Sequence, residues 1–173
     1  MMKADAAKSA HLLLLADESH ASKRMADYIA AIIGRHRNFH LHLLYLMPRM
    51  PVQLLESGGG NTPKQEEEVN AELHRQQEEW INSRKAAAQS TLNQLVAIMR
   101  KGGVSRRAID VEFSDPNEAA ILDRVIPGLA AERGCHTIVI GHESHSWFRE
   151  MTGGHLAEHL LRHTRATAVW VVQ

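Results

Sequence analysis

The chain has 173 residues, of which 44% are hydrophobic and 23% charged, so it can bury one substantial core, and we expect a single domain over residues 1–173. Twenty basic residues balance twenty acidic ones, which removes the electrostatic basis for nucleic-acid binding through clustered phosphate contacts. The single cysteine, Cys135, excludes an intrachain disulfide, and the apolar runs are too short to cross a bilayer. These features predict a cytoplasmic protein with no membrane or nucleic-acid partner.

The first third of the chain predicts two buried strands joined by a helix. The run HLLLLA at 11–16 is continuously apolar, which is typical of a strand covered on both faces. Residues 23–35 carry apolar side chains at helical spacing, and the apolar run at 39–47 is the second predicted strand, which Pro48 stops. The glycine- and proline-rich segment 48–64 that follows predicts a mobile loop.

A long helical insertion is predicted at 65–101. The first half of this segment, QEEEVNAELHRQQEEW, is mostly charged and is expected to lie in solvent. The second half has a packing face formed by Leu92, Leu95, Val96 and Met99.

The remaining segments continue the alternation of strands and helices. The alternating sequence IDVEF at 109–113 predicts a third strand, after which Asp115 is the expected N-cap and Pro116 the first residue of a helix. A fourth strand at 137–140 and a C-terminal apolar strand enclose a Gly-Gly pair and an amphipathic helix. Strict alternation predicts a parallel sheet covered by helices on both faces, an α/β fold.

Ligands of such sheets bind beyond the carboxyl ends of the strands, where the strand order reverses. The candidate loops are Asp17, Glu18 and Ser19 after the first strand and the segment from Gly141 after the fourth. In the second loop a strand ends at a glycine, and a helix begins after another glycine at 153–154. Free backbone N–H groups at such a helix start form an anion-binding site.

At this point the sequence resembles the universal stress protein family over nearly its whole length. The resemblance is carried, in order, by LLLLADES, LHLLYLM, SDPNEAAI, CHTIVIGHES and EHLLRHTRATAVWVV. It implies a five-stranded parallel sheet of order 3-2-1-4-5 with helices on both faces, an adenine nucleotide alpha hydrolase-like or Rossmann-like fold. That order places the first and fourth strands side by side. The resemblance also implies a cytoplasmic stress-response regulator.

One branch of this family binds ATP or AMP through a signature of glycine, two residues, glycine, nine residues, glycine, then serine or threonine. Gly141 and Gly154 match the first and third glycines, whereas Ser144 and His155 replace the second glycine and the hydroxyl residue. A serine in a left-handed conformation costs about 1 to 2 kcal/mol. Loss of one phosphate hydrogen bond costs about 1 kcal/mol or slightly more. Both changes are expected to weaken nucleotide affinity.

The resemblance implies that ATP or AMP, with Mg²⁺ when ATP is bound, lies between the loops after strands one and four. Its adenine or ribose end would contact Asp17, for which an N-cap role at the first helix is the compatible alternative. The full set of residues implied to contact nucleotide is Ala16, Asp17, Glu18, Ser19, Leu46, Met47, Gly141, His142, Ser144, His145, Gly154, His155 and Leu156. For Leu46 and Met47 a purely structural role in the core is the alternative.

The other branch of the family lacks the signature and does not bind ATP. Gly141, His142 and the pair Trp147 and Phe148 are similar to the loop of that branch. The alternative is therefore a nucleotide-free homodimer that acts through protein contacts. In either case the resemblance implies a homodimer through the last strand, with an interface formed by Ala168, Val169, Trp170, Val171 and Val172.

No catalytic constellation is present in the sequence: it has no GxSxG elbow, no GxxxxGK phosphate loop and no nucleophile-base pair at a diagnostic spacing. The resemblance implies slow ATP hydrolysis at most. Cys135 precedes an apolar strand and is expected to be a small buried residue rather than a nucleophile.

Twelve histidines raise the question of a metal site. His155, His159 and His163 share a helix face, but no third ligand type follows at a recognisable spacing, and leucines 156, 160 and 161 mark the opposite, buried face. His40 and His42 share one face of the second strand near its exposed start and are weaker candidates still. We predict no metal.

Overall fold

The computed structural model describes residues 9–55, 62–142, 156–164 and 166–173. It contains a five-stranded sheet of order β3-β2-β1-β4-β5 in which every neighbouring pair is parallel, as predicted. The strands are β1 (Ala10–Ala16), β2 (Phe39–Tyr45), β3 (Ile109–Phe113), β4 (Cys135–Gly141) and β5 (Ala168–Val172).

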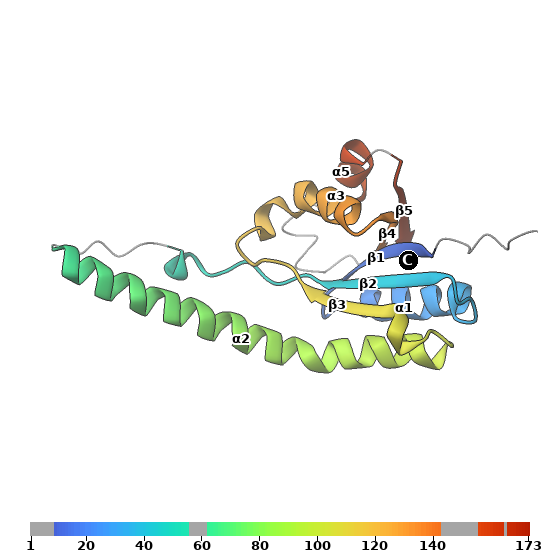
Figure 1. Cartoon of the computed structure of the whole chain (residues 1–173), viewed down its shortest axis with the longest axis horizontal. Coiled ribbons are helices and arrows are strands. Elements are labelled where there is room, and N and C mark those ends of the chain that lie inside the picture. Colours follow the sequence, from blue (N-terminus) through green and yellow to red (C-terminus); the bar gives the residue numbers. More distant parts are fainter. Residues whose placement is uncertain (1–8, 56–61, 143–155, 165) are drawn as a thin grey trace, which may run out of the picture.

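Helices cover both faces of this sheet (Figure 1). The α-helices are α1 (His20–Ile33), α2 (Pro63–Lys101), α3 (Leu122–Glu132) and α5 (Leu156–His163), and short 3-10 turns occupy Val52–Leu54, Arg106–Ala108 and Ala119–Ile121. Helices α1 and α2 lie on one side of the sheet, and α3 and α5 lie on the other.

The continuously apolar β1 is explained by burial on both sides. Leu12 and Leu14 point into the core beneath α1 and α2, whereas Leu13 and Leu15 point into the core beneath α3 and α5. Because successive strand residues face opposite sides, a central strand needs apolar side chains at every position.

Helix α2 is much longer than the sheet that it covers. Its 39 residues span about 58 Å at 1.5 Å per residue, and its buried residues, Ala88, Leu92, Leu95 and Met99, all lie in the second half. The charged first half extends beyond the sheet, as Figure 1 shows. The helix begins two residues earlier than predicted, because the Thr62 hydroxyl caps it by accepting a hydrogen bond from the Gln65 backbone N–H at 3.3 Å.

The helix predicted to start at Pro116 starts later, and that prediction is wrong. The Asp115 carboxylate accepts from the Asn117 backbone N–H at 2.8 Å, which forms a turn, and regular helix begins only at Leu122 after the 3-10 turn. The chain leaves β3 at one edge of the sheet and must pass β2 and β1 before α3 can pack on β4. The segment of turns between β3 and α3 carries the chain across the sheet.

The described part of the predicted loop at 48–64 packs against the rest of the protein. Met50 is buried, and the Gln77 side chain of α2 donates a hydrogen bond to the Leu54 carbonyl at 2.6 Å. Residues 56–61, the centre of the predicted mobile loop, lie outside the described residues. Within the described ranges no helix is both long and apolar enough to span a membrane.

Candidate functional site

The carboxyl ends of β1 and β4 lie side by side, because Leu15 of β1 pairs with Ile140 of β4. The two loops singled out by sequence, after Ala16 and after Gly141, therefore leave the sheet next to each other. This is the position at which open α/β sheets bind ligands.

Asp17 is the organising residue of the first loop. It is only 6% exposed, and its Oδ1 accepts hydrogen bonds from the Ser19 backbone N–H at 2.9 Å, from the Ser22 hydroxyl at 2.8 Å and from the Ser19 hydroxyl. The Asp17 backbone N–H in turn donates to Ser22 Oγ at 2.9 Å. A buried carboxylate needs such donors, and they hold it in one orientation.

This network differs from the predicted cap. Ser19 occupies the N-cap position of α1, but its hydroxyl bonds to Asp17 and makes no capping bond to the helix. The Asp17 carboxylate instead ties the loop to Ser22 in the first turn, so it braces the helix entrance.

Gly141 is required by close packing against α1. A Cβ atom at this position would lie 2.8 Å from the carbonyl carbon and oxygen of Ala21, and backbone atoms cannot move aside cheaply. The glycine thus brings the first turn of α1 against the end of β4. His142, the next residue, is exposed; its N–H donates to the Val172 carbonyl at 2.7 Å, and its carbonyl accepts from Arg24 at 3.0 Å.

A hollow of about 240 Å³ opens at the carboxyl ends of β1 and β2. Its walls come from the first loop, the end of β2 and the middle of α2, and they are formed by Glu18, Tyr45, Leu46, Pro48, Arg84, Ala87 and Ala88. Burial, together with the carboxylates of Glu18 and Asp17, raises the pKa of Tyr45 to about 12, so its phenol keeps its proton at neutral pH. Sequence reasoning missed Tyr45 and Arg84; Arg84 belongs to the helical insertion and carries no local signal of a site.

Three of the predicted contact residues have side chains in the core. Met47 is fully buried with the α1 and α2 layer, and its backbone N–H bonds to Ser114 Oγ at 2.8 Å. Ala16 is buried in the same core, and Leu156 is buried with α3 and α5. Leu46 is also largely buried but reaches the wall of the hollow. Ser144, His145, Gly154 and His155, which include the two departures from the nucleotide signature, lie outside the described residues.

The histidines of α5 contact neighbouring groups. His159 Nδ1 lies 3.0 Å from Oδ2 of Asp123 on α3, and this hydrogen bond lowers the pKa of the Asp123 carboxyl. His163 Nδ1 donates to the His159 carbonyl at 2.8 Å. Leu161, predicted to be buried, is 61% exposed, so that prediction is wrong; Leu156 and Leu160 are buried as expected. Among the described residues this short helix packs chiefly against α3 and β5, so its buried stripe is narrower than predicted.

The fold and the paired loops together define a doubly wound α/β protein with its candidate site at the carboxyl end of the central strands. The model of the universal stress protein family matches residues 9–173, and the chain belongs to this family.

Solved universal stress proteins share this fold at low sequence identity. One from Burkholderia pseudomallei is 20% identical, with a TM-score of 0.56 and coverage of 95% of this chain and 96% of that chain. One from Archaeoglobus fulgidus, solved in complex with dAMP, is 17% identical, with a TM-score of 0.56 and coverage of 96% and 99%. One from Arabidopsis thaliana with AMP bound is 12% identical, with a TM-score of 0.51 and coverage of 94% and 90%. A comparison with curated proteins found no match.

Proposed function

We propose that the protein binds an adenine nucleotide, AMP or ATP with Mg²⁺, in the crevice between the loops after β1 and β4, as part of a cytoplasmic stress-response regulator. The observation that carries this proposal is the buried Asp17 carboxylate, held by donors from Ser19 and Ser22 beside the end of β4. The dAMP and AMP complexes of proteins with the same fold support the choice of ligand class.

The described residues suit the two ends of such a ligand. A fixed carboxylate at the end of β1 can accept hydrogen bonds from a ribose hydroxyl or an adenine amino group, as the family resemblance implies for Asp17. The Arg24 guanidinium donates a hydrogen bond to the His142 carbonyl at 3.0 Å, which puts a positive charge beside the start of the loop after β4 and favours a phosphate there. We assign no catalytic residue, and ATP hydrolysis, if measured, should be slow.

Calorimetry of the full chain with AMP, and with ATP and Mg²⁺, tests this proposal. Binding should be about 30- to 150-fold weaker than for a protein with the complete signature, because Ser144 costs about 1 to 2 kcal/mol and the hydroxyl lost at His155 costs about 1 kcal/mol. Asp17→Asn should weaken it further, whereas Asp27→Asn, at an exposed site on α1, should leave it unchanged. The absence of heat at millimolar ATP would refute nucleotide binding.

The competing proposal is a nucleotide-free protein that acts through protein contacts. It requires side chains of the loop after β4 to fill the crevice. His142, one of the three candidates, is exposed, which argues against its closing the crevice. Trp147 and Phe148, the other two, lie outside the described residues.

We also propose that two copies pair through β5. This strand is at the end of the sheet and pairs only with β4 among the described strands, and Val171 on it is 45% exposed. An apolar edge strand is a surface that antiparallel pairing would cover. Sedimentation at micromolar concentration should show a dimer, and Val171→Lys should shift it to monomer; a monomeric wild type would exclude this interface.

A further inference from the structure

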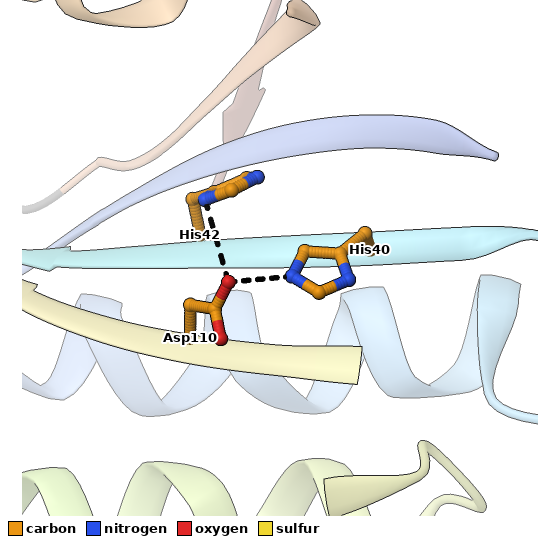
Figure 2. A group of neighbouring side chains, drawn as sticks. All are labelled: His40, His42 and Asp110. Atoms are coloured by element: carbon orange, nitrogen blue, oxygen red, sulfur yellow. Dashed lines mark hydrogen bonds and ion pairs between the residues drawn. The ribbon is translucent and has the colours of Figure 1, made fainter. Parts of the chain in front are cut away.

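A second group of polar side chains lies near the amino ends of the central strands, on the side of the sheet that carries α3 and α5. His40 and His42 of β2 point to this side because they are two residues apart in a strand. Asp110 of β3 is the direct neighbour of His42, and His11 of β1 is the direct neighbour of His40. Figure 2 shows the rings of His40 and His42 directed toward the Asp110 carboxylate.

Two distances define the group. Nε2 of His40 lies 2.7 Å from Oδ2 of Asp110, and Nδ1 of His42 lies 4.0 Å from the same oxygen. The Nδ1 atom of His42 is buried and has no hydrogen-bond partner among the residues that the structure describes. The His42 side chain as a whole is 11% exposed, and that of Asp110 is 56% exposed, so the group is open to solvent on the Asp110 side.

The other nitrogen of His42 explains why Nδ1 is available. Nε2 of His42 lies 3.0 Å from Nδ1 of His11, so the two nitrogens share one proton in a hydrogen bond. When Nε2 of His42 donates this proton, Nδ1 carries a lone pair that faces the Asp110 carboxylate. Two acceptors facing each other are stabilised by a cation between them.

We propose that His40 Nε2, His42 Nδ1 and an Asp110 carboxylate oxygen bind one divalent transition-metal ion of the zinc type. Bonds of about 2.0–2.1 Å at tetrahedral angles place ligand atoms about 3.4 Å apart, and the observed 2.7 Å and 4.0 Å bracket this value. All three ligand atoms lie within 4.8 Å of one another. Two imidazoles and one carboxylate favour Zn²⁺ over Mg²⁺ or Ca²⁺, and water completes the coordination from the open side.

His11 acts as a positioning residue for this site. A metal-bound histidine commonly donates its second ring N–H to an acceptor that fixes its orientation. His11 Nδ1, 3.0 Å from Nε2 of His42, takes this place when Nδ1 of His42 binds the metal. The ring of His11 also stacks on those of His40 and His42, with centroid distances of 5.1 Å and 5.3 Å. All four residues lie on paired strands, which are rigid supports for a metal site.

The chain contains a matched control. His159 and Asp123 also form a histidine-carboxylate contact, at 3.0 Å, but it joins two helices and no third ligand accompanies it among the described residues. If a histidine-aspartate contact were enough for metal binding, both His159–Asp123 and His40–Asp110 would bind metal. Binding that depends on the three-ligand arrangement involves only the group at the amino end.

The test is titration of the metal-free full chain with Zn²⁺ against a chromophoric chelator, without nucleotide. The wild type should bind one Zn²⁺ per chain, and His42→Gln and Asp110→Asn should each lower its affinity more than about tenfold. The double variant His159→Gln with Asp123→Asn should bind as the wild type does. The proposal would be overturned if wild type and His42→Gln bound Zn²⁺ with equal affinity, or if the double variant lost Zn²⁺ binding. It would also be overturned if the wild type did not bind Zn²⁺.

Two further measurements separate ligation from folding. Zn²⁺ should raise the melting temperature of the wild type followed by circular dichroism, and this rise should disappear in Asp110→Asn, whose exposed side chain leaves the core intact. His11→Phe should weaken binding by about 10- to 100-fold while the visible spectrum of the Co²⁺ form keeps its band pattern. A changed band pattern would make His11 a direct ligand, and unchanged affinity would remove its positioning role.

Discussion

Polar side chains at the two ends of the parallel sheet find their hydrogen-bond partners in different ways. At the carboxyl end, Asp17 bonds to Ser19 and Ser22, which are two and five residues away in the chain. At the amino end, His42 bonds to His11, 31 residues away, and His40 bonds to Asp110, 70 residues away. The first network is built by one loop, whereas the second exists only because three strands pair in register.

The difference has an energetic consequence. The Asp17 carboxylate is buried and accepts three hydrogen bonds, so removing it leaves buried donors without their acceptor. The Asp110 carboxylate is mostly exposed, so removing it costs little stability but eliminates a candidate ligand. Stability should therefore depend on the carboxyl end, and metal affinity on the amino end.

The largest expected effect is that of Gly141→Val. Its Cβ would lie 2.8 Å from Ala21 backbone atoms, so we expect the free energy of unfolding to fall by about 3 kcal/mol, with loss of nucleotide binding. Gly128→Ala is the control: Gly128 is an exposed position within α3 where a Cβ meets nothing within 4 Å, and about 0.5–1 kcal/mol of stabilisation should follow. Chemical denaturation measures both changes. An unchanged free energy of unfolding in Gly141→Val would contradict the packing role of this glycine.

The next largest effect is the difference in stability between variants that lack the Asp17 carboxylate and variants that lack the Asp110 carboxylate. Asp17→Ala should lower the free energy of unfolding by about 1–3 kcal/mol, because the Ser19 N–H and Ser22 hydroxyl lose their acceptor. Asp110→Ala should lower it by at most about 1 kcal/mol, as is usual for an exposed ion pair. Urea denaturation of both variants checks the ranking. If Asp110→Ala were the more damaging, the contrast between the two ends would be wrong.

The smallest effect concerns the control pair His159 and Asp123. The hydrogen bond from His159 holds the pKa of Asp123 below its ordinary value of 3.8, so the pair stabilises the fold above that pH. The contribution is lost as the pH falls through the lowered pKa. Asp123→Asn should therefore reduce stability by up to about 1 kcal/mol at pH 6, and this difference should shrink as the pH falls below 3.8 and through the lowered pKa, in parallel denaturation curves. A difference that grew on acidification would have the wrong sign for this contact.

Much of the fold follows from short-range patterns in the sequence. The apolar run at 11–16, the alternation at 109–113 and the order of strands and helices predict the parallel sheet, and the family resemblance adds its order. The errors fall where packing overrides local signals. Asp115 and Pro116 resemble a helix start but form a turn, because the chain must first cross the sheet. Leu161 fits the apolar helical pattern but is exposed on a short helix with few neighbours.

The sequence by itself determined the order of strands and helices, the cover of the sheet on both faces and the position of the candidate loop at Asp17, because these depend on side-chain periodicity along the chain. Only the tertiary structure decided the wall that Tyr45 and Arg84 contribute to the hollow and the approach of Ala21 to Gly141. It also decided the meeting of His11, His40, His42 and Asp110. Each of these depends on strand register or helix placement, which brings together residues whose separation in the chain carries no signal.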